Sequence, residues 1–359
     1  MILTNITLDQ FKNHHHFEAR FCPGFNIISG KNGVGKTNVL DALYAACTGR
    51  CYFHRQDKFN IEHDQDFAAI KADITKDNKS SQILIGFKRG SAKTIRRDGG
   101  KTIKITDYIG DYPVVFIGPA DIQLVNGRSE DRRKFLDSII SQCFPEYLSD
   151  LMQYGKLLDM RNKQLKQFAE QSYFDANLLE AIDQQLYTPA QKIHETRTQF
   201  LAEFAPFFEE YYRLISEAVE TPKIEYKSHL NGATLEELFK ENLAKDRITE
   251  RSNKGVHKDD LLFYLSDFEA KNYASQGQVK SFIISLKLAS YMYLKSHIET
   301  RPILLLDDIF EKIDSGRAAR LLELISQKDF GQVFITDTEK ERVHQALAQT
   351  KSEKLDVEL

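Results

Sequence analysis

A glycine-rich loop between an apolar segment and a predicted helix constrains the fold of this chain more than any other feature. Residues 25–29 predict a short buried strand, and residues 38–46 predict a helix. Glycines between them let the backbone turn tightly and aim successive N–H groups at phosphate oxygens. The helix N-terminus adds partial positive charge. The loop therefore predicts a nucleotide-phosphate site, formed by Gly30, Lys31, Asn32, Gly33, Val34, Gly35, Lys36, Thr37 and Asn38.

Two side chains of this loop carry its predicted chemistry. Lys36 is placed to contact the β- and γ-phosphates, and the Thr37 hydroxyl is placed to bind Mg²⁺. The alternative is a glycine-rich turn that matches by chance, which the flanking strand and helix disfavour. The predicted cofactors are therefore ATP and Mg²⁺.

A pair of carboxylates follows an apolar segment far downstream. Residues 303–306 predict a buried strand that ends at Asp307 and Asp308. Asp307 is the candidate Mg²⁺ ligand. Alternation turns Asp308 to the other face, where it is predicted to orient or deprotonate the attacking water. Such a pair alone is also typical of a strand-end turn, and the glycine loop upstream favours the catalytic interpretation.

A third motif stands at the head of an apolar helix. A serine N-cap followed by a glycine at a helix N-terminus can form an anion site, although an ordinary N-cap explains the segment equally well. A segment so distant along the chain cannot form a second phosphate site on the nucleotide that the glycine loop of the same subunit holds. The predicted ligand is therefore the γ-phosphate bound to a second copy of the chain, and the motif is Ser275, Gln276, Gly277 and Gln278.

The pattern along the chain predicts an α/β fold with a helical insertion. Residues 67–117 alternate as strands do, whereas residues 130–218 carry helical spacing and predict two longer antiparallel helices. After residue 276, helices and strands alternate again. We expect an ATP-binding lobe of residues 1–120 and 260–359, a mixed sheet with flanking helices. A mostly helical lobe of residues 121–259 interrupts it.

The composition of the 359-residue chain indicates its expected cellular location and the state of its cysteines. We find no run of about 20 apolar residues that would span a membrane and no secretory signal, so a cytoplasmic location without a membrane partner is expected. The cysteines are expected to be reduced, because Cys22, Cys47, Cys51 and Cys143 fit no zinc spacing. Residues 14–16, three histidines, are predicted to lie in a solvated turn rather than to bind metal.

The three motifs together resemble the nucleotide-binding heads of ABC and SMC ATPases, and further segments resemble the RecF family of bacterial recombination and repair proteins. The likeness covers nearly the whole chain. It is carried by Phe11-Lys12-Asn13-His14, Gly35-Lys36-Thr37-Asn38, Leu40-Asp41-Ala42, Arg132-Arg133-Lys134-Phe135-Leu136-Asp137, Tyr154, Arg161-Asn162, Leu165, Gly255-Val256-His257-Lys258-Asp259-Asp260 and Ala274-Ser275-Gln276-Gly277-Gln278.

The resemblance implies an ABC-type ATPase head that works as an ATP-dependent homodimer. ATP would lie between Lys36, Thr37 and Asp307 of one subunit and Ser275 and Gly277 of the other. The dimer would clamp double-stranded DNA at gaps or single-strand/double-strand junctions. With RecR and RecO it would help to load recombinase, and it would be a weak DNA-dependent ATPase. Asp308 stands where most ABC proteins carry glutamate, which predicts slow hydrolysis.

Several positions depart from the family pattern. Residues 128–130 stand where a proline is usual, and Val256 also replaces a proline. Residues 311–314 read Glu-Lys-Ile-Asp where the family favours Ser-Glu-Leu-Asp. Asp337 replaces the switch histidine of ABC transporters, and we identify no Q-loop glutamine near residues 117–119. The missing histidine argues against a transporter subunit. Another ABC-type machine and a P-loop kinase stay as alternatives, although a kinase would leave residues 275–278 without a role.

A basic segment predicts contact with DNA phosphates, although the formal net charge of the chain is −3. Asp98 is the only acid within residues 88–104, and a predicted hairpin turn at residues 98–100 could bring the basic side chains to one face. A merely solvated hairpin is the alternative. Residues 132–134 are a second candidate, with internal ion pairs as an equal alternative. The hairpin candidates are Lys88, Arg89, Lys93, Arg96, Arg97, Lys101 and Lys104.

Overall fold

The chain forms two compact units. The computed structural model describes residues 1–54, 56–216, 220–308, 315–327, 330–348 and 350–359. One unit, here the sheet unit, comprises Met1–Ile122, Glu210–Val219 and Ser275–Leu359. The other, here the helical unit, comprises Gln123–Glu209 and Glu220–Ala274. Within the described ranges, none of the helices has the length and apolar character of a membrane span.

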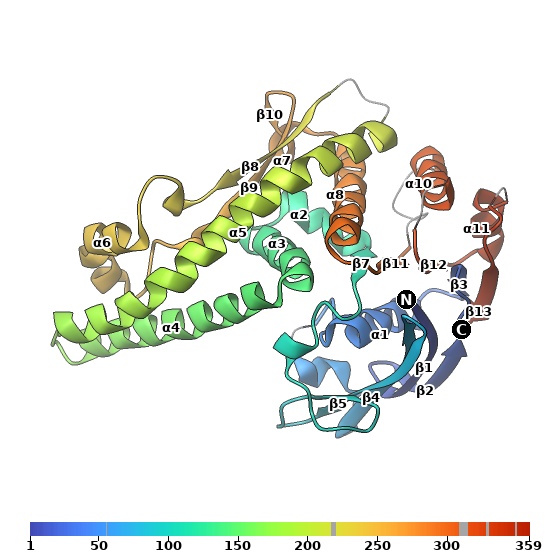
Figure 1. Ribbon diagram of the computed structural model, residues 1–359, viewed down its shortest axis with the longest axis horizontal. Helices are drawn as coiled ribbons and strands as arrows, with labels where there is room; N and C mark the ends of the chain where they lie inside the picture. The colour runs from blue at the N-terminus through green and yellow to red at the C-terminus, as the bar shows by residue number, and fades with distance from the viewer. Residues whose placement is uncertain (55, 217–219, 309–314, 328–329, 349) are drawn as a thin grey trace. The chain divides into compact units, whose positions relative to one another are not determined.

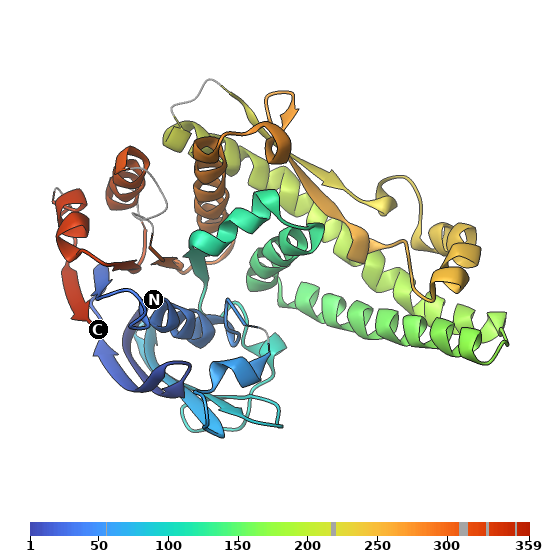
Figure 2. The same ribbon diagram turned by 180° about the vertical axis from the view of Figure 1, so that it is seen from behind.

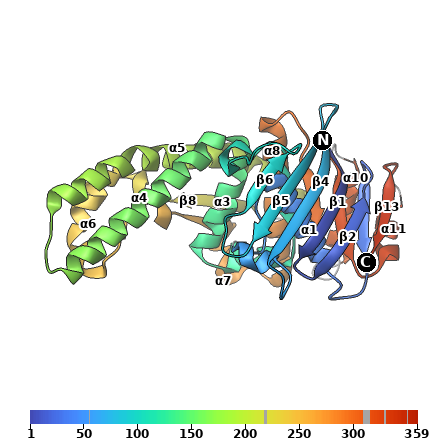
Figure 3. The same cartoon turned by 90° about the horizontal axis from the view of Figure 1, so that it is seen from below.

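An antiparallel sheet forms one layer of the sheet unit, and its strands lie side by side in Figure 3 in the order β2-β1-β4-β5-β6. Buried and exposed residues alternate along β4, as expected for a sheet with one face on the core. The strands are β1 (Ile2–Phe11), β2 (His14–Arg20), β4 (Phe67–Lys76), β5 (Lys79–Lys88) and β6 (Thr94–Arg97).

The predicted hairpin after β6 is only partly correct. Asp98 and Gly99 adopt the positive φ values of a tight turn, 52° and 69°. The expected second arm is not a strand, because it contributes only one bridge from Thr102 to Arg96. The chain then enters a short 3₁₀ helix at Ile105–Asp107.

A parallel sheet forms a second layer in the order β13-β3-β12-β11-β7. Its central strands are buried along their whole length, because both faces of the sheet are covered. The register pairs Ser29 with Asp337, and Leu306 with Ile117 and Ile335. The carboxyl ends of these strands therefore meet at one edge. The strands are β3 (Phe25–Ser29), β7 (Val114–Ile117), β11 (Ile303–Leu306), β12 (Val333–Asp337) and β13 (Lys354–Glu358).

Helix α1 (Lys36–Thr48) lies between the two sheets of the sheet unit (Figures 1 and 2). One hydrophobic cluster joins Leu43 of α1 to Ile70 of β4 and Leu305 of β11. Helix α8 (Gln276–His297) packs on β7, and α11 (Lys340–Ala346) packs on β3 and on α10 (Ser315–Gln327). The predicted α/β class is thus confirmed, with antiparallel and parallel strands in separate sheets instead of one mixed sheet.

The helical unit contains the two long helices that the apolar spacing predicted. Helix α4 (Pro145–Glu170) and helix α5 (Ala176–Ser216) are joined by a short connection and share the cluster of Leu165, Phe168 and Leu179. Strands β8 (Pro222–Lys227), β9 (Asp260–Leu265) and β10 (Phe268–Glu269) form an antiparallel sheet. The other helices are α2 (Gln123–Asn126), α3 (Ser129–Cys143), α6 (Leu235–Thr249) and α7 (Ala270–Tyr273).

The unit boundaries follow these pairings. Residues 260–274, which we placed in the ATP-binding lobe, belong to the helical unit because β9 pairs with both β8 and β10. The end of α5, from Glu210, belongs to the sheet unit, where Tyr212 meets Phe282 of α8 at 5.9 Å between ring centroids.

Candidate nucleotide-binding site

The glycine loop leaves the carboxyl end of β3 and leads into α1, as the sequence predicted. Its glycines adopt positive φ angles, 85° at Gly33 and 112° at Gly35. At Gly35 a Cβ atom would lie 2.4 Å from Nε2 of His14, so a larger residue would have to displace this side chain and would strain the backbone. Gly35 is also the N-cap of α1, whose first residue is Lys36.

Lys36 is buried within the glycine loop. The residue is 5% exposed, and Nζ donates to the carbonyl oxygens of Gly30 at 2.8 Å and Lys31 at 3.1 Å. The ammonium is therefore held in the concave side of the loop. A phosphate bound there would replace two neutral acceptors with charged ones, which form stronger hydrogen bonds.

Thr37, Asp307 and Thr336 form one oxygen cluster at the carboxyl edge of the parallel sheet. The Thr37 hydroxyl donates to both carboxylate oxygens of Asp307, at 2.9 and 3.1 Å, and the Thr336 hydroxyl donates to Oδ1 at 2.8 Å. Such hard oxygen donors suit Mg²⁺, which takes few protein ligands when phosphates supply the others. The sequence predicted Thr37 and Asp307 as members of this cluster but not Thr336.

Burial gives the Asp307 carboxyl an unusual pKa. Desolvation raises its pKa to about 6, and hydrogen bonds from Thr336 and Thr37 offset part of the rise. Asp308 follows one residue beyond β11, with a half-exposed side chain and a φ of 46°. Its backbone N–H donates to the Thr336 hydroxyl at 2.9 Å. Thr336 therefore links the backbone of one carboxylate residue to the side chain of the other.

The turn between β1 and β2 braces the glycine loop from the antiparallel sheet. Asn13 Nδ2 donates to Val34 O at 3.1 Å, and Asn13 Oδ1 accepts from Asn38 Nδ2 at 2.7 Å. His14 Nε2 lies 3.1 Å from Gly35 O, and Lys12 pairs with the buried Asp41 of α1. The sequence indicated this segment only as part of a family resemblance.

The prediction for residues 14–16 was wrong in its structure. These histidines lie in β2 rather than in a solvated turn, and the turn itself covers only residues 12–13. His14 is buried against the glycine loop, and burial lowers its pKa. His15 and His16 are exposed and pair with single carboxylates, Glu62 and Asp9. Within the described residues, no group of three or more histidine, cysteine, aspartate or glutamate side chains is arranged to hold a metal ion.

The Ser275–Gln278 motif caps the N-terminus of α8 through two reciprocal hydrogen bonds. Ser275 Oγ accepts from Gln278 N at 3.2 Å, and Gln278 Oε1 accepts from Ser275 N at 2.7 Å, a capping box. Ser275 and Gln276 are exposed. A Cβ atom at Gly277 would lie 3.1 Å from Nη1 of Arg317, whose Nε donates to Ser281 at 2.7 Å. The helix thus presents its first turn to solvent beside a guanidinium group.

Asp337, which occupies the place of a switch histidine, is not directed at solvent. It is 1% exposed, and its carboxylate accepts from Arg342 at 2.7 and 2.9 Å and from Glu339 N at 2.7 Å. Residues 311–314, the departure from the Ser-Glu-Leu-Asp pattern, lie outside the described residues.

An aspartate, Asp121, follows β7 in the region where a Q-loop glutamine would lie. Asp121 Oδ2 accepts from Gly118 N at 2.8 Å, and Oδ1 lies 2.7 Å from Lys287 Nζ of α8. Tyr52 donates to the same carboxylate and accepts from Lys287 at 2.9 Å. This buried network joins the end of β7 to α8, the helix that carries the Ser275–Gln278 motif.

A cavity of about 640 Å³ opens beside the glycine loop. It lies at the carboxyl edge of the parallel sheet, where the chain leaves β3, β12 and β13, and its lining carries charges of both signs. The lining residues are Ser29, Gly30, Lys31, Asn32, Val34, Thr338, Glu339, Lys340, Glu341, Glu358 and Leu359.

The basic hairpin residues do not form one uniform surface. Lys88, Arg89, Arg96, Lys101 and Lys104 are exposed. Lys93 pairs with Asp57 at 3.3 Å, and Arg97 pairs with Asp111.

The second candidate for contact with DNA, residues 132–134, is bound within the helical unit. Arg132 binds Asp260 through two hydrogen bonds of 2.6 and 2.9 Å, and Lys134 pairs with Glu130 at 2.5 Å. Internal pairing, one of the two alternatives for residues 132–134, therefore accounts for Arg132 and Lys134.

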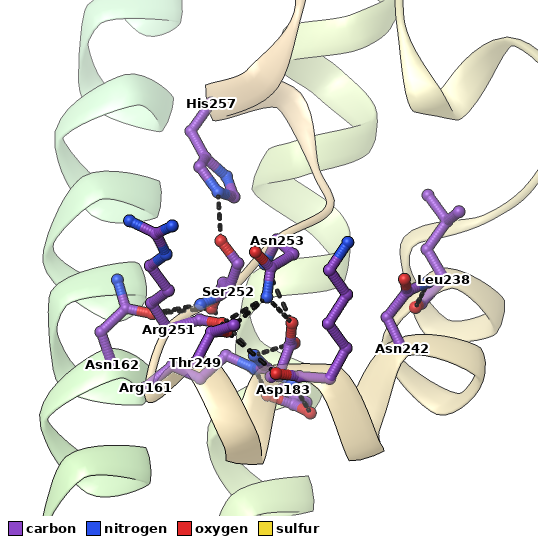
Figure 4. A network of polar contacts seen from close by, with 12 residues as sticks. Arg161, Asn162, Asp183, Leu238, Asn242, Thr249, Arg251, Ser252, Asn253 and His257 are labelled. Atoms are coloured by element: carbon purple, nitrogen blue, oxygen red, sulfur yellow. Dashed lines mark hydrogen bonds and ion pairs between the residues drawn. The ribbon is translucent and has the colours of Figure 1, made fainter.

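Other residues that carried the family resemblance belong to a buried polar network in the helical unit (Figure 4). Arg161 is fully buried and binds Asp183 and Asp246, each at 2.7 Å. His257 lies 2.7 Å from the Tyr154 hydroxyl, and burial lowers the pKa of His257 to about 4. Breaking a buried ion pair of this kind typically costs about 3–5 kcal/mol. These residues are thus structural, and the sequence alone did not reveal that.

A parallel sheet with a glycine loop, a carboxylate pair and a serine-capped helix defines an ATPase head of the ABC and SMC class. The family described as RecF/RecN/SMC N-terminal domain matches residues 2–356. The chain belongs to the RecF family of DNA replication and repair proteins. It is 41% identical to RecF of Flavobacterium johnsoniae over 350 residues, which cover 98% of each chain.

Two further comparisons agree with this assignment. RecF of Phocaeicola vulgatus is 38% identical over 98% of this chain and 95% of its own length. A solved structure of the recombination mediator protein RecF-ATPrS in the RecFOR pathway superposes with a TM-score of 0.88 at 26% identity. The match covers 99% of this chain and 96% of that one. The predicted family resemblance is confirmed.

Asp307→Asn should stabilise the protein while removing the proposed Mg²⁺ ligand. The folded-state pKa of about 6 lies above the ordinary 3.8, so stability falls as pH rises between these values and stays lower above them. Asparagine removes this penalty, which is at most roughly 3 kcal/mol, and still accepts from Thr37 and Thr336. Thermal unfolding should show a higher midpoint for the variant, with a larger gain at about pH 8 than at about pH 5. A rise in the midpoint that is equal at the two pH values, or larger at about pH 5, would contradict the raised pKa of Asp307.

Proposed function

We propose that this chain is an ATP-dependent DNA-binding protein of recombinational repair and replication. ATP joins two copies into a dimer that clamps double-stranded DNA at gaps or junctions and, with RecR and RecO, helps to load recombinase. Hydrolysis of ATP is slow and releases the clamp. Membership in the RecF family supports this proposal. So do structures of a related protein described as a recombination mediator in the RecFOR pathway, one of them of RecF-ATP at 27% identity.

The observation that carries the proposal is the oxygen cluster beside the buried Lys36. The ammonium would contact the β- and γ-phosphates, and the N–H groups of the glycine loop would bind the same oxygens. Thr37 and Asp307 would hold Mg²⁺, which when bound neutralises charge on the phosphates. Asp308, next to this cluster and half-exposed, would orient the attacking water.

The exposed first turn of α8 supports the dimer. Ser275 and Gln276 stand at a helix N-terminus, where free N–H groups and the helix dipole favour an anion. In a dimer that anion is the γ-phosphate held by the glycine loop of the second copy. ATP then shifts the monomer–dimer equilibrium by its higher affinity for the dimer. Removal of the γ-phosphate takes away this shared ligand, and the dimer loosens.

Light scattering tests the proposal directly. Without nucleotide the 41.4 kDa chain should be a monomer, and with ATP it should reach twice this mass. Double-stranded DNA should favour the dimer further. A mass that does not respond to ATP would contradict the proposal, because a P-loop kinase acting as a monomer would give this result.

Ser275→Arg should separate ATP binding from dimerisation. The glycine loop is unchanged, so ATP affinity should stay within about 3-fold, whereas the bulky cation should weaken the ATP-dependent dimer about 10-fold or more. Ser275→Thr is the matched control, since threonine keeps a capping hydroxyl. Analytical ultracentrifugation measures the dimer. If Ser275→Arg forms it as tightly as the original chain, the first turn of α8 is not part of the interface.

A further inference from the structure

Basic side chains gather on the loop that follows α6 in the helical unit. Arg251 and Lys258 are exposed, and Lys254 is half-exposed. Lys227, at the end of β8, is also exposed. We call Arg251, Lys254 and Lys258 the basic loop. In the part of the chain that the structure describes, none of its three side chains forms an ion pair, in contrast to Lys93 and Arg97 of the hairpin.

Lys258 lies close to Arg251 and Arg133, and both Lys254 and Lys258 lie close to His229. Burial first, then the charges of Arg251 and Arg133, lower the pKa of Lys258. His229 also has a lowered pKa, first from burial and then from Lys254. Positive charges that disfavour each other in this way form a region of positive potential.

Two buried carboxylates beside the basic loop are already bound, whereas Glu250, directly before Arg251, is exposed. Asp246 is fully buried and accepts from Arg161 at 2.7 Å and from Asn253 at 2.8 Å. Asp259 is 1% exposed, and its Oδ2 accepts from Arg197 at 2.8 Å. Asp246 and Asp259 therefore compensate buried arginines. Within residues 250–258, the three cations of the basic loop exceed the single carboxylate, Glu250, and leave a net positive charge available to an external anion.

The buried network holds the basic loop in one conformation. Figure 4 shows Ser252 bound to Asn162, whose Oδ1 accepts from the Ser252 N–H at 2.7 Å and from its hydroxyl at 2.8 Å. His257 Nε2 lies 3.1 Å from Ser252 O. Because the backbone on both sides of Lys254 is anchored, binding of an anion costs little loop entropy.

We propose that the basic loop binds the sugar-phosphate backbone of duplex DNA, as a site separate from the hairpin of the sheet unit. The inference rests on the proposed function, which makes DNA the ligand. Arginine and lysine side chains on a fixed loop suit phosphates, which are contacted without regard to base sequence. Each phosphate contact releases counterions, so the basic loop contributes a measurable part of the salt dependence of binding.

The test compares the full chain with a variant carrying Arg251→Gln, Lys254→Gln and Lys258→Gln. Fluorescence anisotropy with a labelled duplex, in the presence of ATP, gives affinities between about 50 and 200 mM salt. The slope of log affinity against log salt should fall by about 2 to 3, and affinity at low salt by about 10- to 100-fold. The matched control carries Lys166→Gln, Lys192→Gln and Lys240→Gln, which remove the same charge from paired positions in the same unit.

The outcomes separate this inference from the proposed function. If the unmodified chain binds no duplex, the proposed function fails. If it binds and the basic-loop variant keeps its slope and affinity, the basic loop is not a DNA site, and the proposed function stands. A loss in the control variant as large as in the basic-loop variant would also overturn the inference. If the triple variant folds poorly, the single variant Lys258→Gln replaces it. Its slope of log affinity against log salt should be lower by about 1, and an unchanged slope would overturn the inference.

Discussion

Lys36→Ala should abolish ATP binding and, with it, ATP-driven dimerisation. The ammonium lies buried in the glycine loop, 2.8 Å from Gly30 O, and the other cation within residues 30–38, Lys31, is exposed and does not replace it. A charged hydrogen bond contributes about 1.5–3 kcal/mol, so loss of contacts to two phosphates should weaken ATP binding about 100-fold or more. Isothermal titration calorimetry measures the binding, and light scattering measures the dimer.

Lys31→Ala is the matched control for this experiment. Its side chain is exposed, and only its backbone belongs to the predicted phosphate site. This variant should keep ATP affinity within about 3-fold. A dimer that persists unchanged in Lys36→Ala without ATP would refute the idea that ATP drives association.

Asp308→Asn should slow ATP hydrolysis about 100-fold or more and prolong the ATP-bound dimer. Asparagine has nearly the same shape as aspartate but cannot take a proton from water. The backbone N–H of this residue still donates to Thr336, so the position of the residue should not change. Phosphate release measured under single-turnover conditions reports the chemical step, and the lifetime of the dimer after dilution reports the clamp.

Asp308→Glu provides the contrasting variant. The longer carboxylate, usual in ABC proteins, should place the water better, so its hydrolysis should be at least as fast as that of the original chain. If Asp308→Asn hydrolyses ATP at the original rate, Asp308 is not the group that activates the water. If hydrolysis slows but the dimer dissociates as before, hydrolysis does not control release.

Local motifs predicted the components of the candidate site, because each depends on residues adjacent in sequence. The positive φ angles at Gly33 and Gly35 require glycine, which makes the loop recognisable. The apolar run before Asp307 predicted a strand buried on both faces. Ser275 and Gln278 are three residues apart, the spacing of a capping box.

Other expectations failed because tertiary contacts decided them. A run of three histidines indicated a polar turn, but His14 packs under Gly35 as part of β2. The expected arm after residue 100 became a short 3₁₀ helix, although its turn was predicted correctly. Alternation and turn residues indicate where strands are possible, whereas pairing with a neighbouring strand decides whether they form.

By itself, the sequence determined the glycine loop, the carboxylate pair, the helix cap and the family, since short-range patterns carry all of them. Only the tertiary structure decided that Thr336 joins Asp307 and Asp308, because β12 must pair beside β11 for the contact to exist. It likewise bound Arg132 to Asp260, 128 residues away, and left Arg251, Lys254 and Lys258 without ion-pair partners among the described residues. Charges look alike in a sequence, and the fold alone determines which of them are neutralised.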